Sequence, residues 1–260
     1  MFDEQLVIVG TGIRTTGQLT MEAVAWMERA DKLFYVVGDP VAAEVIHQIN
    51  PAGAQSLLGL YGEGKLRMET YEQMVEAILA SVRSGNLTVA AFYGHPGVFA
   101  YPSHEAIRRA RREGYRARML PGISAEDCLF ADLGVDPAIN GCQSYEATDF
   151  MVNGRVIDTS SQVILWQIGA VGDPTFRTYA YDLSALPLLM ERLYQYYPST
   201  HQVYIYEAAT LPGQEASVKQ VPLAMLPSAG VTPASTLYIP PARPTVPDAS
   251  ISHRLRLLQQ

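Results

Sequence analysis

Residues 5–37, QLVIVGTGIRTTGQLTMEAVAWMERADKLFYVV, decide the fold. Residues 5–9 form a short apolar run that ends at Gly10, residues 19–30 carry apolar side chains at helical spacing, and residues 32–37 return to strand composition. A strand, a helix and a second strand in this order need a crossover connection, which usually joins parallel strands. The segment therefore predicts an α/β fold.

The same alternation continues through the first half of the chain. Helices are expected over residues 70–84, 102–113 and 124–133, and strands over residues 87–93 and 116–120. Thr70 and Gln73 have the spacing of a capping box, and Gly85 would supply a left-handed helix end. Ser124 is expected to cap its helix, with Asp127 at the third helical position.

The second half lacks the regular alternation of strand and helix. Strands are expected over residues 162–168, 202–207 and 235–239, and one clear helix is expected over residues 184–196. This pattern predicts a mixed sheet. We place the break between halves at residues 119–122, which gives an N-terminal α/β domain over residues 1–120 and a C-terminal α/β domain over residues 121–241. Residues 242–260 form a tail, whose end is expected to be a short helix that docks on the body or on another subunit.

Composition and charge limit which classes of function are possible. The chain has 260 residues, of which 48% are hydrophobic and 17% charged, so it has ample material for one large or two small folded domains. The net charge of −7 disfavours nucleic acid as a partner. Six arginines lie between residues 108 and 118, but Glu105 and Glu113 are interleaved with them, so we interpret this stretch as a solvated helix face.

Cysteine usage and the N-terminus indicate a cytoplasmic protein. Cys128 and Cys142 are too few for a disulfide framework, and neither has metal-ligand spacing with the five histidines, so no metal site is expected. The first residues lack the features of a signal peptide, and no run of 18 apolar residues predicts a membrane span.

Glycine-rich loops follow three of the expected strands. Gly10 and Gly12 invite a dinucleotide-binding interpretation with Asp31 as the ribose ligand, but Thr15 stands where the third glycine would be, which argues against a nicotinamide or flavin enzyme. Residues 93–99, YGHPGVF, and 121–127, PGISAED, each lie at the carboxyl end of a strand, where open α/β sheets bind ligands. Two such loops predict a cleft for an adenosine-sized ligand.

These loops carry a resemblance to a known family. Residues 9–13, 93–99, 120–133 and 235–241 resemble the tetrapyrrole methylase fold, and residues 70–74 together with 124–133 resemble its borosin branch, the peptide backbone α-N-methyltransferases. The likeness covers about residues 6–241. It implies a homodimer of two-domain α/β subunits, with S-adenosylmethionine bent into the cleft between the domains.

The resemblance also assigns residues. It implies that the cofactor is bound by Tyr93, His95, Val98, Phe99, Ser124, Ala125, Gln167, Ala208, Ser235 and Thr236. It implies that the catalytic residues are Tyr61, Arg67, Tyr71 and Tyr93. The chain departs from its relatives at residues 58–61, LGLY, where only the last position of a tyrosine-rich run is a tyrosine, so substrate packing there is expected to differ.

Backbone N-methylation explains why such residues are needed. A peptide nitrogen is a poor nucleophile because its lone pair is delocalised into the carbonyl group. Our hypothesis is that Tyr71 takes the amide proton, helped by a neighbouring cation that lowers its pKa, and that Arg67 stabilises the phenolate and the imidate oxygen. Their spacing of four residues puts them on one helix face if the helix starts early enough. Tyr93 and Tyr61 would orient the peptide, and His95, the rival base, is assigned to the cofactor site.

The substrate is expected to be a separate precursor peptide, because the chain stops at Gln260 without the apolar extension that fungal relatives carry as their substrate. Two alternatives stay open. One is a methyltransferase that acts on a precorrin-like macrocycle or another small molecule, although the acidic balance argues weakly against it. The other is a non-catalytic module that binds cofactor or peptide, which loss of Arg67 or Tyr71 would have supported.

Overall fold

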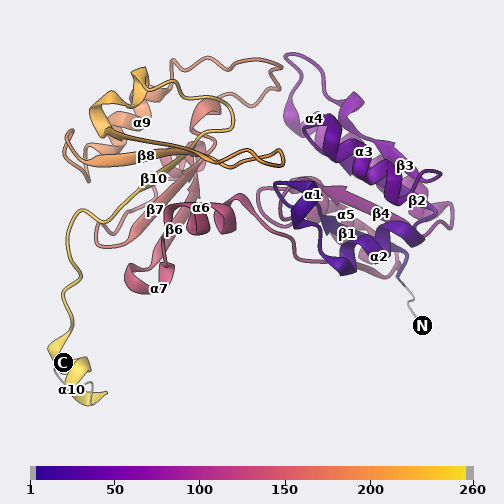
Figure 1. The fold of residues 1–260 in the computed structure, drawn as a ribbon, viewed down its shortest axis with the longest axis horizontal. Coiled ribbons are helices and arrows are strands. Elements are labelled where there is room, and N and C mark those ends of the chain that lie inside the picture. The colour runs from indigo at the N-terminus through magenta and orange to yellow at the C-terminus, as the bar shows by residue number, and fades with distance from the viewer. Residues whose placement is uncertain (1–3, 256–260) are drawn as a thin grey trace. The chain divides into compact units, whose positions relative to one another are not determined.

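The computed structural model describes residues 4–255, which divide into two compact units. The first unit contains the chain up to Val135 together with two later segments, Asp173–Ala180 and Ala208–Ser217. The second contains Asp136–Gly172, Tyr181–Glu207 and the chain from Val218 onward. Residues 121–135 therefore belong to the first unit, whereas the division expected from the sequence assigned them to the second domain. Figure 1 follows the elements in chain order by colour.

A parallel five-stranded sheet forms the centre of the first unit, as the crossover pattern predicted, with the strand order β3-β2-β4-β1-β5. Its strands are β1 (Leu6–Gly10), β2 (Lys32–Val36), β3 (Ala54–Ser56), β4 (Thr88–Phe92) and β5 (Ala117–Met119). Its helices are α1 (Thr15–Gln18), α2 (Met21–Arg29), α3 (Pro40–Ile49), the short 3-10 helix η1 (Leu58–Leu60), α4 (Arg67–Arg83), α5 (Tyr101–Arg112) and α6 (Ala125–Leu133).

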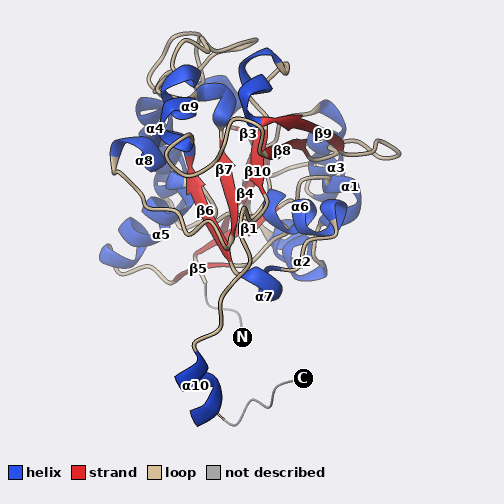
Figure 2. Cartoon of the chain, turned by 90° about the vertical axis from the view of Figure 1, so that its left-hand side faces the viewer, coloured by secondary structure: helices blue, strands red, loops and turns tan. Residues whose placement is uncertain are grey.

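Helices cover both faces of this sheet (Figure 2). Leu6 and Ile8 point into a cluster with α4 and α5, while Val7 and Val9 point into a second cluster with α2 and α3. Successive side chains of a strand face opposite sides, so a strand buried on both faces must be apolar at every position. The uninterrupted run in β1, which is fully buried, is the sequence signal of that arrangement.

The ends of two helices test the capping predictions. The capping box of Ser124 and Asp127 is present at the start of α6, and Gly85 has the left-handed φ of +87° that was expected after α4. The prediction that Thr70 and Gln73 form a capping box is wrong, because α4 already begins at Arg67. The Arg67 amide donates to the carbonyl of Pro174, so a remote segment satisfies the helix start that local sequence was expected to cap.

The second unit is built around a mixed sheet, as predicted. Its strand order is β6-β7-β10-β8-β9, in which β6 and β7 are parallel and β10 is antiparallel to both of its neighbours. The strands are β6 (Cys142–Glu146), β7 (Gln162–Trp166), β8 (Gln202–Glu207), β9 (Ser217–Pro222) and β10 (Thr236–Ile239). The helices are α7 (Pro137–Asn140), α8 (Ala147–Val152), η2 (Ile168–Ala170), α9 (Leu186–Leu193), η3 (Leu223–Ser228) and α10 (Ala249–Arg254).

The arginine-rich stretch and the C-terminal tail can be compared with what the sequence predicted. The arginine-rich stretch was expected to be a solvated helix face, but only its first four arginines lie in α5, and Arg118 lies in β5. Glu105 is buried and accepts hydrogen bonds from Arg108 and Arg109, so this part of the helix is an ion-paired cluster. The tail helix begins at Ala249, and the part of the expected helix beyond residue 255 lies outside the described residues. Within residues 4–255, no helix is long and apolar enough to cross a membrane.

Candidate active site

Three glycine loops meet at the carboxyl edge of the first sheet. A Cβ atom on Gly10 would lie 2.3 Å from the carbonyl oxygen of Gly94, and one on Gly122 would lie 2.9 Å from the same oxygen. Gly12 and Gly94 also form an isolated antiparallel bridge. The loops after β1, β4 and β5 therefore pack backbone against backbone, which only residues without a side chain allow. This edge is where parallel sheets bind ligands.

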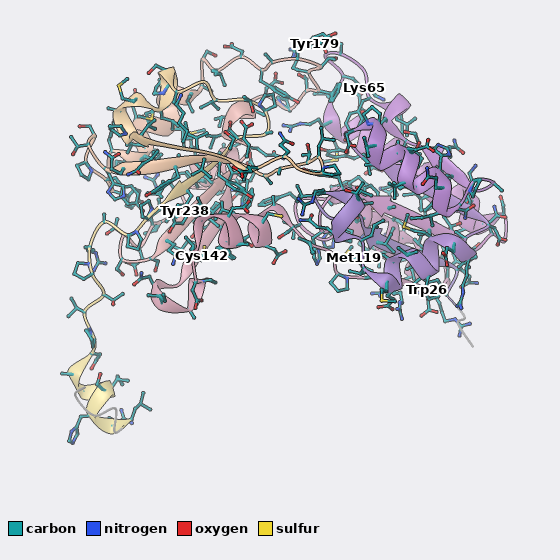
Figure 3. The ribbon with its side chains drawn as sticks, in the orientation of Figure 1. Trp26, Lys65, Met119, Cys142, Tyr179 and Tyr238 are labelled. Carbon is teal, nitrogen blue, oxygen red and sulfur yellow. The ribbon has the colours of Figure 1, made fainter. Side chains whose placement is uncertain are left out.

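The loop after β4 leaves large apolar side chains in contact with solvent. Tyr93, Val98 and Phe99 have exposed fractions of 42%, 38% and 51%. The ring of His95 holds the loop together, because its Nδ1 atom accepts from the Gly97 amide at 2.9 Å. Figure 3 labels Met119 on β5, whose sulfur is 3.0 Å from where a Cβ on Gly97 would lie. The loop thus presents an apolar surface on a fixed backbone.

Backbone strain marks two of the residues expected to bind the cofactor. Phe99 and Gln167 are the non-glycine residues with positive φ in the part of the chain that the structure describes, at +51° and +59°. Such conformations cost about 1–3 kcal/mol each and gather at functional sites. Phe99 belongs to the loop after β4, and Gln167 follows β7 directly.

The residues expected to bind the cofactor fall into two groups, one in each unit. Ser124, whose hydroxyl accepts from the Asp127 amide, and Ala125 lie at the start of α6 in the first unit, which also holds residues 93–99 and Ala208. In the second unit, Ser235 donates from Oγ to Glu207 at 2.6 Å, and the pairing of β10 with β7 brings Ser235 and Thr236 to the strand end that carries Gln167.

Arg67 and Tyr71 lie one turn apart at the start of α4. The Arg67 guanidinium donates from Nη2 to the backbone carbonyl of Asp173 at 2.5 Å. The ring of Tyr71 is half-buried against the helical core and lies 6.2 Å from the ring of Tyr101. Positions four apart on a helix are neighbours on one face, so the spacing that the hypothesis needed is present.

The segment Asp173–Ala180 runs beside residues 61–67. Phe176 exchanges backbone hydrogen bonds with Gly64 and Lys65, and Leu66 forms a bridge with Thr175. Lys65, labelled in Figure 3 just before α4, donates from Nζ to the Leu60 carbonyl. These bonds explain how a segment that follows β7 by several residues comes to hold Arg67 in place.

A hollow of about 360 Å³ opens in the first unit and brings two of the predicted catalytic residues together. Tyr61 and Tyr93 line it, and the ring of Tyr61 lies 4.6 Å from that of Phe176. Arg67 and Tyr71 are not among its lining residues. Its other walls come from Val36, Val37, Gly38, Asp39, Leu58 and Thr210.

Sequence reasoning missed most of these walls. Val36 ends β2 and residues 37–39 follow it directly, so the rule that ligands bind at the carboxyl ends of parallel strands predicts their place. Phe176 and Thr210 carry no such signal, because they belong to the two later segments that fold with the first unit.

Electrostatics bear on the role of Tyr93. Although 42% of Tyr93 is exposed, desolvation of its phenol group raises its pKa to about 12, and the nearby Cys128 and Asp39 add to the shift. Tyr93 therefore stays protonated at neutral pH and can donate a hydrogen bond, which suits orientation of a peptide rather than removal of a proton.

Two further points of the sequence analysis concern a dinucleotide site and a metal site. The Asp31 carboxylate accepts from the Leu87 amide at 2.8 Å, which occupies the side chain that a dinucleotide site would have used for ribose. Among the described residues, no group of three or more His, Cys, Asp or Glu side chains could hold a metal ion.

Comparisons with known proteins agree with this architecture. Residues 5–226 match the family described as Tetrapyrrole (Corrin/Porphyrin) Methylases. The chain is 44% identical over 257 residues to the methyltransferase/ribosomally synthesized cyclic peptide gymnopeptides precursor of Gymnopus fusipes, covering 97% of this chain and 61% of that protein. It is 43% identical over 257 residues to the corresponding omphalotin A precursor of Omphalotus olearius, with the same coverage. The chain thus spans about three-fifths of the length of these relatives.

Solved structures support the fold. The uroporphyrin-III-C-methyltransferase from Thermus thermophilus has a TM-score of 0.65 at 17% identity, covering 92% of this chain and 93% of that one. A cobalt precorrin-4 methyltransferase has a TM-score of 0.64 at 14% identity, covering 91% of this chain and 95% of that one. At these identities the likeness concerns the fold alone.

Proposed function

The chain belongs to the tetrapyrrole methylase family, and on that premise we propose that it transfers methyl groups from S-adenosylmethionine to backbone amide nitrogens of a ribosomally made peptide. Relatives whose names join a methyltransferase to a cyclic-peptide precursor support a peptide substrate. One observation carries the proposal: Tyr93 belongs both to the loop expected to hold the cofactor and to the hollow that it shares with Tyr61.

The residues present fit S-adenosylmethionine. The apolar side chains of Val98 and Phe99 suit the flat base of a nucleoside, and the backbone of Phe99 is held in a strained conformation that such contact would explain. We assign the cofactor to residues 93–99, Ser124, Ala125 and Ala208 of the first unit, with Gln167, Ser235 and Thr236 of the second. When bound, the sulfonium supplies an electrophilic methyl group.

The work left to the protein is to make an amide nitrogen nucleophilic. In this proposal Tyr71 acts as the phenolate, whose Oη atom accepts the amide proton and becomes a phenol. The Arg67 guanidinium, fixed by the Asp173 carbonyl, stabilises negative charge on the phenolate before this step and on the imidate oxygen after it. Tyr93, protonated at neutral pH, donates to the peptide and orients it, and Tyr61 packs beside it in the same hollow.

The hollow also bears on the macrocycle alternative. A precorrin carries carboxylates that call for basic groups in the wall, but the one charged residue among those lining the hollow is Asp39. A volume of about 360 Å³ is at the low end of small-molecule sites, which favours part of a peptide over a tetrapyrrole. The non-catalytic alternative is disfavoured because Tyr61, Arg67, Tyr71 and Tyr93 are all present.

Incubation of the chain with S-adenosylmethionine and a separate precursor peptide tests the proposal. Mass spectrometry should show the peptide gaining mass in steps of one methyl group, with fragment ions that place each group on a backbone nitrogen. This result would also support a precursor supplied in trans. Methylation of a precorrin but not of any peptide would contradict the proposal. We further propose a homodimer, which light scattering checks.

A further inference from the structure

The hollow of the first unit has the chemistry of a side-chain pocket. Its walls are mostly apolar or aromatic, from Val36, Val37, Leu58 and the rings of Tyr61, Tyr93 and Phe176. Leu58 and Tyr93 keep exposed fractions of 41% and 42%, so these two wall residues present apolar surface that a ligand can cover. Burial of apolar surface against such walls stabilises a bound apolar group by an amount that grows with its area.

The size of the hollow limits what enters it. Sites for drug-sized ligands run from about 300 to 1,000 Å³, and this one measures about 360 Å³. That volume accommodates one large side chain with its flanking backbone. Because Tyr61 and Tyr93 line the wall, a side chain placed here belongs to a residue close to the amide nitrogen that reacts.

Asp39 adds a charge to this apolar site. Its Oδ1 atom accepts from the Ala42 amide at 2.8 Å and caps α3, so the helix holds the carboxylate at the wall. Among the described residues that line the hollow there is no lysine, arginine or histidine to neutralise it. A second carboxylate brought into this site would be desolvated next to a like charge, which is strongly unfavourable.

We infer that this hollow is a specificity subsite that receives one large, uncharged apolar side chain of the substrate peptide, and that Asp39 excludes acidic side chains from it. The inference rests on the proposed function only for its link to methyl transfer. The selectivity itself follows from the walls of the hollow and is a property of binding.

Host–guest peptides test the inference. The probes are acetyl-Ala-Ala-Xaa-Ala-Ala-amide with leucine, alanine, glutamine or glutamate as the guest, measured by calorimetry for binding and by mass spectrometry for methylation. We expect the leucine peptide to bind about tenfold more tightly than the alanine peptide. The glutamate peptide should bind about tenfold more weakly than the glutamine peptide, which has the same shape without the charge.

Two variants connect these differences to the hollow. Asp39→Asn retains a good helix cap and removes the charge, so the ratio between the glutamine and glutamate peptides should fall toward one. Leu58→Trp fills the hollow from an exposed position and should abolish the preference for leucine over alanine. Leu188→Trp is the matched control, since Leu188 is also exposed but belongs to the second unit, and it should leave both ratios unchanged.

The two readouts separate the subsite from the reaction. If the peptides bind in the expected order but gain no methyl groups, the subsite holds and the proposed function fails. If they are methylated but bind without preference, the function holds and the subsite fails. The inference would be overturned if the ratio of glutamine-peptide to glutamate-peptide affinity were the same in wild type and Asp39→Asn. It would also be overturned if none of the four peptides bound measurably.

Discussion

Replacing Gly10 with alanine perturbs the point where the three glycine loops meet. The new Cβ would lie 2.3 Å from the Gly94 carbonyl oxygen, 2.8 Å from the ring of Pro96 and 3.1 Å from the Cα of Gly122. Overpacking of a well-packed region costs about 1–3 kcal/mol, and neither backbone atoms nor a proline ring can rotate away. We therefore expect Gly10→Ala to lower the free energy of unfolding by about 3 kcal/mol.

Urea denaturation followed by tryptophan fluorescence measures this effect. Trp26 lies in the first unit and Trp166 in the second, so a Trp166→Phe background makes the signal report the first unit alone. Gly59→Ala is the control, since nothing lies within 4 Å of its Cβ position, and it should change stability by less than about 0.5 kcal/mol. If Gly10→Ala unfolds at the same urea concentration as Gly59→Ala, the packing argument is refuted.

Three further predictions concern the surroundings of the site. Ser124→Ala removes the cap of α6 and should cost about 1 kcal/mol in the same urea assay, with no loss if the cap contributes nothing. The Arg108 and Arg109 guanidiniums lower the pKa of Glu105 from its ordinary value of 4.5 to about 2. The ionised carboxylate therefore stabilises the fold fully above about pH 4.5, and this stabilisation is lost as the pH falls through 2. The melting temperature of Glu105→Gln should therefore lie below that of wild type at pH 7, and the gap should close toward pH 2; a gap independent of pH would contradict this. Asp173→Ala should slow peptide methylation about tenfold by releasing the turn that holds Arg67, and Asp173→Asn, which can still accept from Thr175, should restore the rate.

The sequence predicted the parts of the fold that depend on local signals. The buried run of β1 identified a strand covered on both faces, and Ser124 with Asp127 located the start of α6 to the residue. These features depend on side chains within a few positions of one another, where spacing carries the information.

The start of α4 shows where such reasoning ends. Thr70 has the spacing of a cap, but it is buried and its hydroxyl donates to the Leu60 carbonyl at 3.4 Å instead. The helix begins three residues earlier because the Pro174 carbonyl accepts from the Arg67 amide. A hydrogen bond between residues more than a hundred positions apart cannot be predicted from the spacing of neighbouring residues.

The candidate site also contains some parts that local sequence predicts and others that it does not. The loops that contain Tyr93 and Ser124 follow strands, so their position at one sheet edge was predictable. Phe176 and Thr210, in contrast, reach the hollow on segments that leave the second half of the chain to fold with the first unit. Asp39 has a local capping role that would have hidden its place in the wall even from a correct assignment of α3.

Methyl transfer by Tyr71→Phe and Arg67→Ala variants tests the central claim most directly. Each variant is first shown to bind S-adenosylmethionine as wild type does, and its single-turnover rate is then measured with the same peptide. Loss of the proton acceptor or of its charged partner should slow transfer by about 10²–10³. Rates close to that of wild type in both variants would mean that neither side chain activates the amide nitrogen.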